Sequence, residues 1–191
     1  MIIKGKSVII RAIEEKDLEV LWQAINSEDL ERMENGYCFP VSFEGQKKWF
    51  EQNGNSTLKD AKLIIEYEGK AIGYTNVINI DWKNRVAHTG IKIFSREFRN
   101  KGLGKDAVMA IMRFCFDELN LNRLEGFILE YNKPSYTLYV DKCGWKVEGK
   151  KREYVYKNGS YHDLLMVGIL KSDYLQLLKE NNYWDIEEEN R

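Results

Sequence analysis

A strand-like run, a glycine turn and a long amphipathic segment follow one another in the middle of this chain and constrain its fold more than any other feature. Residues 87–94 (AHTGIKIF) have the pattern of a strand, and residues 103–119 carry apolar side chains at helical spacing. Between them, residues 99–104 (RNKGLG) match R-x-x-G-x-G. The sequence therefore predicts a strand that turns tightly into a helix.

The glycine turn is a candidate binding site for an anion. At the start of a helix the first backbone N–H groups have no partner inside the helix, and the helix dipole adds partial positive charge there. Two glycines let the backbone approach a ligand closely. From Arg99 onward no carboxylate comes before Asp106, and three basic side chains lie in or beside the turn: Arg99, Lys101 and Lys105. We expect a phosphate or pyrophosphate group here.

Composition favours one folded domain with a small-molecule partner. Of the 191 residues, 43% are hydrophobic and 13% aromatic, and we place the domain at residues 1–175 and an acidic tail at 176–191. Lys and Arg number 29 against 30 Asp and Glu, so neither nucleic acid nor an anionic membrane is expected as partner. No apolar stretch approaches the ~18 residues that span a bilayer, and a signal-peptide pattern is lacking, so a cytoplasmic location is expected.

The cysteines predict neither disulfides nor a metal site. Cys38, Cys115 and Cys143 are an odd number without C-x-x-C spacing, and only two histidines occur. We expect three reduced thiols, with Cys115 and Cys143 serving as packing residues.

Patterns elsewhere predict a mixed α+β fold, with helices on both faces of one sheet. Ser42 is expected to cap one helix, Pro134 to open another and Gly144 to end it. Asn158-Gly159 favours a tight turn between the last two strands. We expect strands at residues 8–11, 62–67, 71–80, 87–94, 124–131, 145–156 and 161–170, and helices at 14–26, 43–52, 103–119 and 134–143.

A second group of residues, one strand beyond the predicted long helix, makes the glycine turn specific. Its members are Asn132, Ser135, Tyr139, Lys142, Gly144 and Trp145. With the turn, this group resembles the GNAT superfamily of N-acetyltransferases, and within it the ribosomal-protein-alanine and spermidine acetyltransferase branch. The family's glycine loop is written Q/R-x-x-G-x-G/A, which Arg99, Gly102 and Gly104 satisfy. Trp145 stands where phenylalanine is usual, and the resemblance covers nearly the whole chain.

The resemblance implies the GNAT fold, a twisted, mostly antiparallel sheet of six to seven strands that is splayed in the middle. The strand ending at Phe94 would part from the strand beginning near Leu124, with the pantetheine arm of acetyl-CoA between them. The pyrophosphate would bind at the glycine turn, and a backbone N–H on the strand before it would polarise the thioester carbonyl. The residues expected to bind acetyl-CoA are Ile91, Lys92, Ile93, Arg99, Asn100, Lys101, Gly102, Leu103, Gly104, Lys105, Asn132, Ser135 and Lys142.

The reaction implied is direct attack of a neutral amine on the thioester, without a covalent acetyl-enzyme. Tyr139 is the predicted general acid, which protonates the departing thiolate. A phenol with a pKa of about 10 is protonated at neutral pH and lies close to a thiol at about 8.5. The general base stays open between Glu66, His88, Glu130 and a chain of water molecules.

The acceptor also stays open between a polyamine such as spermidine, an amino sugar, an antibiotic and a protein N-terminus. Residues 27–41 are acidic and irregular, and we interpret them as a substrate lid. Carboxylates there would attract a cationic amine, and the candidate substrate-binding residues are Glu31, Glu34 and Tyr37. A homodimer formed through a sheet edge is a further expectation from the family.

Other readings of the glycine turn fit less well. A dinucleotide-binding fold needs G-x-G-x-x-G near the start of a parallel βαβ unit, and a P-loop needs a hydroxyl residue where Asp106 follows Lys105. The remaining alternative is a non-catalytic module that keeps the fold and binds an acyl-CoA as a sensor. Retention of Tyr139 argues against it.

Overall fold

A single mixed sheet of eight strands forms the centre of the computed structural model, which describes residues 1–36 and 39–184. The strand order is β1-β2-β3-β4-β5-β6-β8-β7, and every neighbouring pair is antiparallel except β5 and β6. The strands are β1 (Ile3–Lys4), β2 (Ile9–Ala12), β3 (Ala61–Tyr67), β4 (Lys70–Asp81), β5 (Val86–Ile93), β6 (Arg123–Leu129), β7 (Lys146–Lys157) and β8 (Ser160–Leu170). The α+β class and the meander β3-β4-β5 are confirmed. The strand beyond the six to seven expected is β1, whose two residues are too short to show a period.

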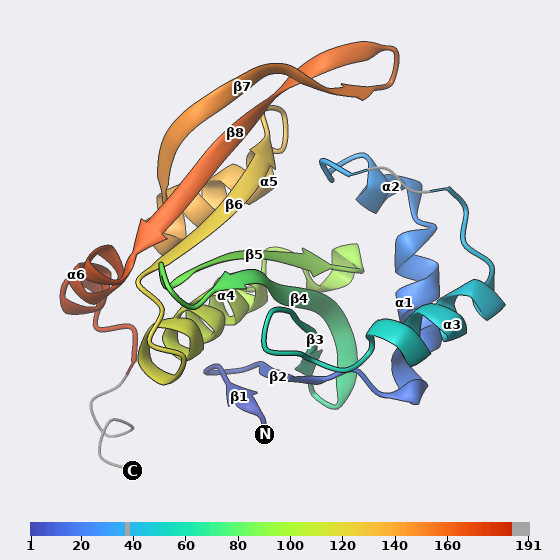
Figure 1. Cartoon of the computed structure of the whole chain (residues 1–191), viewed down its shortest axis with the longest axis horizontal. Helices are drawn as coiled ribbons and strands as arrows, with labels where there is room; N and C mark the ends of the chain where they lie inside the picture. The colour runs from blue at the N-terminus through green and yellow to red at the C-terminus, as the bar shows by residue number, and fades with distance from the viewer. Residues whose placement is uncertain (37–38, 185–191) are drawn as a thin grey trace.

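The sheet splits between β5 and β6, as the family resemblance implied. These strands pair at only three positions, from Val86↔Arg123 to His88↔Glu125. Beyond them β5 runs on to Ile93 beside β4, and β6 runs on to Leu129 beside β8. Figure 1 shows β6 and the β7–β8 arm rising away from β5. One side of β5 therefore has no neighbouring strand along its second half.

Helices cover both faces of the sheet. On one face lies α4 (Leu103–Arg113), which continues through a wider turn, η3 (Phe114–Glu118), and whose apolar residues enter the main core. On the other face α1 (Leu18–Ile25) and α3 (Phe43–Asn53) pack around Ile64. Ser42 caps α3 as expected, because its Oγ accepts from the Gly45 N–H at 3.0 Å. No helix in the described ranges is long and apolar enough to cross a membrane.

The last described residues lie on the α4 side of the sheet. Helix α6 (Lys171–Asn181) leads to Trp184, which is 5% exposed. The indole N–H of Trp184 donates to the hydroxyl of Tyr174 at 3.0 Å, and the Arg113 guanidinium lies 3.7 Å from the indole centroid. Part of the segment predicted as an acidic tail, up to residue 184, is thus packed on the fold, whereas residues 185–191 lie outside the described ranges.

Candidate active site

The glycine turn is built as the sequence predicts. Gly102 has φ of 83°, a left-handed conformation in which glycine avoids strain, and it caps α4. The first bond of the helix runs from the Asp106 N–H to the Gly102 carbonyl at 3.0 Å. The N–H groups of Leu103, Gly104 and Lys105 therefore precede the first intrahelical bond and are free of partners within the helix. This is the geometry of an anion site.

The charge around the turn is positive because its one carboxylate is turned inward. Asp106 is 4% exposed and accepts from the backbone N–H groups of Lys6, Ser7 and Val8 at 2.7–2.9 Å. It also accepts from the Tyr183 hydroxyl at 2.9 Å. These four donors satisfy the carboxylate, so the start of α4 keeps its attraction for an external anion.

The basic side chains of the turn lie along its rim. Arg99 reaches the carbonyl of Ile93 at 3.4 Å, and the ammonium groups of Lys101 and Lys105 lie over the rings of Phe98 and Tyr183. None of these three cations is ion-paired with a carboxylate in the described part of the chain. They are available to a negatively charged ligand.

Tyr139 lies at the split in the sheet. It belongs to η4 (Thr137–Lys142), which follows the short helix α5 (Lys133–Tyr136), and its ring meets Trp145 edge-on with centroids 4.9 Å apart. A narrow pocket beside it is lined by Thr89, Ile91, Val108, Ile111, Met112, Tyr139 and Trp145. The structure thus brings together Ile91 and Tyr139, two residues that the family resemblance predicted to share one site. Of these lining residues, sequence reasoning gave no role to Thr89 or Met112.

The Tyr139 hydroxyl is buried without a hydrogen-bond partner among the described residues. Burial raises the pKa of this phenol well above its usual value, with a smaller rise from Cys143 and a small opposing effect of the nearby Ile91 backbone. The group therefore keeps its proton through the neutral range. A buried donor that the fold leaves unused is the property expected of a proton donor to a bound ligand.

Asn132 serves the local fold. Its Oδ1 accepts from the Ser135 N–H at 3.1 Å and so caps α5, while its Nδ2 donates to the Met33 carbonyl at 2.9 Å. Lys142 ends η4 and is exposed. The contacts of Asn132, Ser135 and Lys142 with acetyl-CoA stay predictions.

The acidic segment contains a short helix, α2 (Glu28–Glu31), and it bridges the two halves of the sheet. On the side of the N-terminal half of the sheet, this segment forms two ion pairs. Glu34 pairs with Lys92 of β5, and Asp29 pairs with Arg96 in the turn after β5. Toward the other half Glu31 pairs with the buried Lys157, and the Arg32 carbonyl accepts a hydrogen bond from the Tyr131 hydroxyl. Glu31 and Glu34 are thus already matched with lysine ammonium groups. Tyr37 lies outside the described residues.

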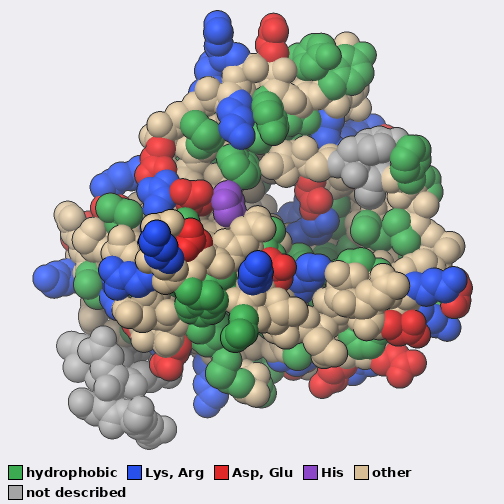
Figure 2. All heavy atoms as spheres, viewed as in Figure 1, with side chains coloured by type: hydrophobic (Ala, Val, Ile, Leu, Met, Phe, Trp, Pro, Cys, Tyr) green, Lys and Arg blue, Asp and Glu red, His purple; other side chains and the backbone are tan. Residues whose placement is uncertain are grey.

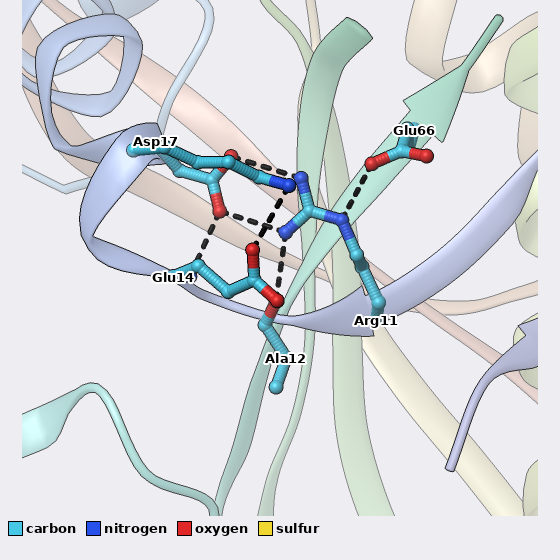
Figure 3. Close-up of polar contacts among 6 residues, drawn as sticks. Arg11, Ala12, Glu14, Asp17 and Glu66 are labelled. Carbon is cyan, nitrogen blue, oxygen red and sulfur yellow. Dashed lines mark hydrogen bonds and ion pairs between the residues drawn. The ribbon is translucent and has the colours of Figure 1, made fainter. Parts of the chain in front are cut away.

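Glu66, one candidate base, is part of a buried ion-pair network (Figure 3). Arg11 donates from Nε to Glu66 at 2.6 Å and from Nη1 and Nη2 to Asp17 at 2.7 and 2.9 Å. The bond to Asp17 raises the pKa of Arg11 despite its burial. Strand β4 lies between Glu66 and the split edge of β5. These contacts give Glu66 a structural role.

The other two candidates are nearer the split. His88 lies at the last paired position of β5 and β6, where its Nε2 is 3.3 Å from Glu125 and its ring stacks on Phe127. Glu130 follows β6 and faces His162 of β8 across 3.5 Å. Sequence reasoning missed His162, since the predicted strand began at Tyr161; β8 begins at Ser160, and the period-two spacing places Ser160 and His162 on one face.

The molecule is hollowed where the β7–β8 arm overhangs its body. Figure 2 shows this opening, with Lys, Arg, Asp and Glu side chains around it. A split sheet, a helix start that favours anions and a buried unpaired phenol meet along one side of β5. This combination suits an elongated ligand with an anionic end.

Comparison with known proteins agrees with that geometry. The family model for the acetyltransferase (GNAT) domain matches residues 7–146. The chain belongs to this family. It is an enzyme of the N-acetyltransferase class. The match includes the split strand, the glycine turn and Tyr139.

Individual relatives cover nearly all of the chain. A putative ribosomal N-acetyltransferase of Bacillus subtilis is 30% identical, over 89% of this chain and 94% of its own. Spermidine N(1)-acetyltransferase of Vibrio cholerae is 25% identical, over 90% and 97%. Among solved structures, a spermidine N-acetyltransferase from Vibrio cholerae in complex with CoA and spermine superposes with a TM-score of 0.81 at 24% identity, over 90% and 99%. The GNAT fold is therefore confirmed.

Proposed function

We propose that this acetyltransferase takes its acetyl group from acetyl-CoA and transfers it to a primary amine by direct attack. The observation that carries the proposal is the buried, unpartnered hydroxyl of Tyr139 beside the split edge of β5. The anion-binding start of α4 lies on the same side of the sheet. A thioester with a pyrophosphate arm matches these two features.

The glycine turn and the free edge of β5 bind the two ends of the acetyl-CoA arm. The N–H groups of Leu103, Gly104 and Lys105 bind the pyrophosphate, with Arg99 and Lys101 at the rim. The unpaired edge of β5 near Ile91 offers backbone groups to the pantetheine amides. Acetyl-CoA supplies an activated thioester there.

Tyr139 holds the proton needed at the end of the reaction. Its Oη donates this proton to the departing sulfur, and the raised pKa of the phenol ensures that the proton is present at neutral pH. Cys143 and Cys115 are buried, and desolvation raises the pKa of each thiol to about 12. Thiols held protonated in this way are poor nucleophiles, which supports direct transfer without an acetyl-cysteine.

A polyamine is the first candidate acceptor. The acidic segment 28–34 lies beside β5, where a polyamine would have to compete with Lys92 for Glu34 and with Lys157 for Glu31. The likeness to spermidine acetyltransferase supports the same class. A protein N-terminus is the second candidate, supported by the 30% identity with the putative ribosomal N-acetyltransferase.

An amine panel tests the proposal directly. The full chain is incubated with labelled acetyl-CoA and spermidine, spermine, an amino sugar or a peptide with a free N-terminus. Release of free thiol and the mass of the product are recorded. Transfer to spermidine is the expected result, and transfer to the peptide alone would select the second candidate. Tight CoA binding without transfer to any amine would identify a sensor and overturn the proposal.

Cofactor binding is tested separately. Replacing Arg99 and Lys101 together by alanine should weaken CoA binding about tenfold, equivalent to ~1.4 kcal/mol. Arg96→Ala is the matched control, because Arg96 lies three positions before Arg99 but is paired with Asp29. Equal affinities in the double variant and the control would place the pyrophosphate elsewhere.

A further inference from the structure

A hollow of about 470 Å³ lies where the end of β6 meets the turn between β7 and β8. It is lined by Glu130, Tyr131, Asn158, Ser160 and His162. Neither the glycine turn nor Tyr139 belongs to it. The proposed function therefore leaves this hollow without a role.

Three side chains of the hollow form a continuous chain of polar contacts. Ser160 Oγ lies 3.0 Å from His162 Nε2, and His162 Nδ1 lies 3.5 Å from Glu130 Oε1. Ser160 and His162 are two positions apart on β8 and so project from the same face. Glu130 is held in place because its Oε1 also accepts from the Asp163 N–H at 3.1 Å.

The chemistry of the three groups determines which of them donates and which accepts in each polar contact. An ionised carboxylate only accepts hydrogen bonds, so the proton of a neutral His162 belongs on Nδ1, toward Glu130. Nε2 then carries the lone pair and accepts from the Ser160 hydroxyl at 3.0 Å, which is closer than the other acceptor of that hydroxyl, the Lys157 carbonyl at 3.5 Å. In this arrangement the oxygen of Ser160 keeps a lone pair for a donor in the hollow. An ammonium group is such a donor.

The hollow borders the acidic segment proposed to receive the acceptor. The Tyr131 ring meets His162 edge-on at 4.7 Å, and the Tyr131 hydroxyl donates to the Arg32 carbonyl at 2.6 Å. Lys157, the register partner of Ser160, is paired with Glu31 of α2. Ser160 is therefore adjacent to a β7 residue that contacts the acidic segment.

We propose that Ser160, His162 and Glu130 form the proton relay that converts the acceptor ammonium into the nucleophilic amine, an inference that rests on the proposed function. The ammonium gives its proton to Ser160 Oγ as the Ser160 hydroxyl proton moves to His162 Nε2. The products are a neutral amine, an unchanged serine and an imidazolium. Glu130 is a positioning residue, because it orients the ring and stabilises the imidazolium through Nδ1–H.

The charged groups around the imidazole agree with this direction of transfer. Glu130 is the carboxylate that faces His162, and the cation nearest in register, Lys157, is neutralised by Glu31. Asp163 is engaged with Lys150.

A pH profile of acetyl transfer tests the relay. An acceptor ammonium with a pKa of about 10.4 is almost fully protonated at pH 7, so an enzyme without the relay depends on the small free-amine fraction. His162→Gln and Ser160→Ala should each lower kcat/KM at pH 7 about 100-fold. Activity of both variants should recover toward wild type near pH 10, where the amine is largely neutral. Ser160 is exposed, so its alanine variant is expected to fold even if the histidine variant does not.

The controls separate the relay from structural damage and from the proposed function. Ser172→Ala, an exposed serine on α6, should retain the wild-type profile, and CoA affinity should be unchanged in all three variants. A loss that is equal at every pH, or an unchanged profile in Ser160→Ala, would overturn the relay and leave the proposed function standing. Absence of transfer by the wild-type protein to any amine would overturn both.

Discussion

Replacing Tyr139 by phenylalanine should make the protein more stable and less active. The Tyr139 side chain is buried, and its hydroxyl has no hydrogen-bond partner among the described residues. A buried polar group without a partner costs about 1–3 kcal/mol relative to its hydrated state. Phenylalanine keeps the ring against Trp145, with centroids at 4.9 Å in the wild type, and removes that cost.

The burial of the hydroxyl and the length of the chain set the expected change in stability. A gain of about 1–2 kcal/mol in the free energy of unfolding corresponds to an increase in Tm of about 2–8 °C for a chain of this size. The turnover number should fall about 100-fold or more, because a general acid contributes on the order of 10²–10⁴ to a rate. CoA affinity should change little.

Tyr174→Phe provides the matched control. Tyr174 is also fully buried, but its hydroxyl accepts from the Trp184 indole N–H at 3.0 Å. Removing that acceptor leaves a buried donor unpaired and should lower stability by about 1–3 kcal/mol. Thermal unfolding of the three proteins without ligand, together with kcat from thiol release, measures both predictions.

Two results would refute the reasoning about Tyr139. A Tyr139→Phe protein that melts below the wild type would mean that the hydroxyl is satisfied in the folded state. An unchanged kcat would remove Tyr139 as the general acid, whatever the change in stability.

Four further substitutions test contacts outside the pocket. Asp106→Asn should cost about 3 kcal/mol in urea unfolding, because an amide cannot accept from all four donors; an unchanged midpoint would contradict this. Burial disfavours the charge on Asp17, but hydrogen bonds from Arg11 and the Glu14 backbone outweigh burial and lower its pKa. This carboxylate therefore contributes stability above about pH 4 that disappears as the pH falls through the lowered folded-state pKa, and Asp17→Asn should flatten the stability curve there; equal slopes would argue against it. Glu31→Gln should cost about 1–3 kcal/mol because Lys157 is buried, whereas Glu28→Gln, whose pair with Arg32 is exposed, should cost almost nothing; thermal unfolding that ranks them the other way would reject the distinction.

Local chemistry made the geometry of the glycine turn predictable from sequence. Gly102 occupies a left-handed position at a helix start, and this requirement is visible as a glycine between a strand and an amphipathic segment. Asn158 and Gly159 both have positive φ, as their turn type demands. The same local rules placed Ser42 at its cap. Each of these features depends on residues within a few positions of one another.

Contacts between residues far apart in the sequence could not be predicted from it. The partners of the acidic segment could not be read from its composition, because Glu31 and Lys157 are 126 residues apart and meet only once β7 folds back over α2. The relay depends in the same way on the register that brings Glu130 beside His162. No periodicity in the sequence marks the split between β5 and β6, so it was predicted only from the family resemblance. Burial of the Tyr139 hydroxyl likewise emerges only when η4 packs on Trp145.

The inward-facing carboxylate of Asp106 connects residues 6–8 and Tyr183 to the first turn of α4. Backbone groups of residues 6–8 reach it from the N-terminus, and Tyr183 reaches it from the C-terminus. A fusion tag placed close to residues 6–8, or a truncation before residue 183, would remove or displace donors to Asp106 and so disturb the turn that is proposed to hold the pyrophosphate, without touching any ligand. Recombinant versions of this enzyme should therefore be compared by CoA affinity as well as by yield, since a misplaced tag would resemble a defect in the active site.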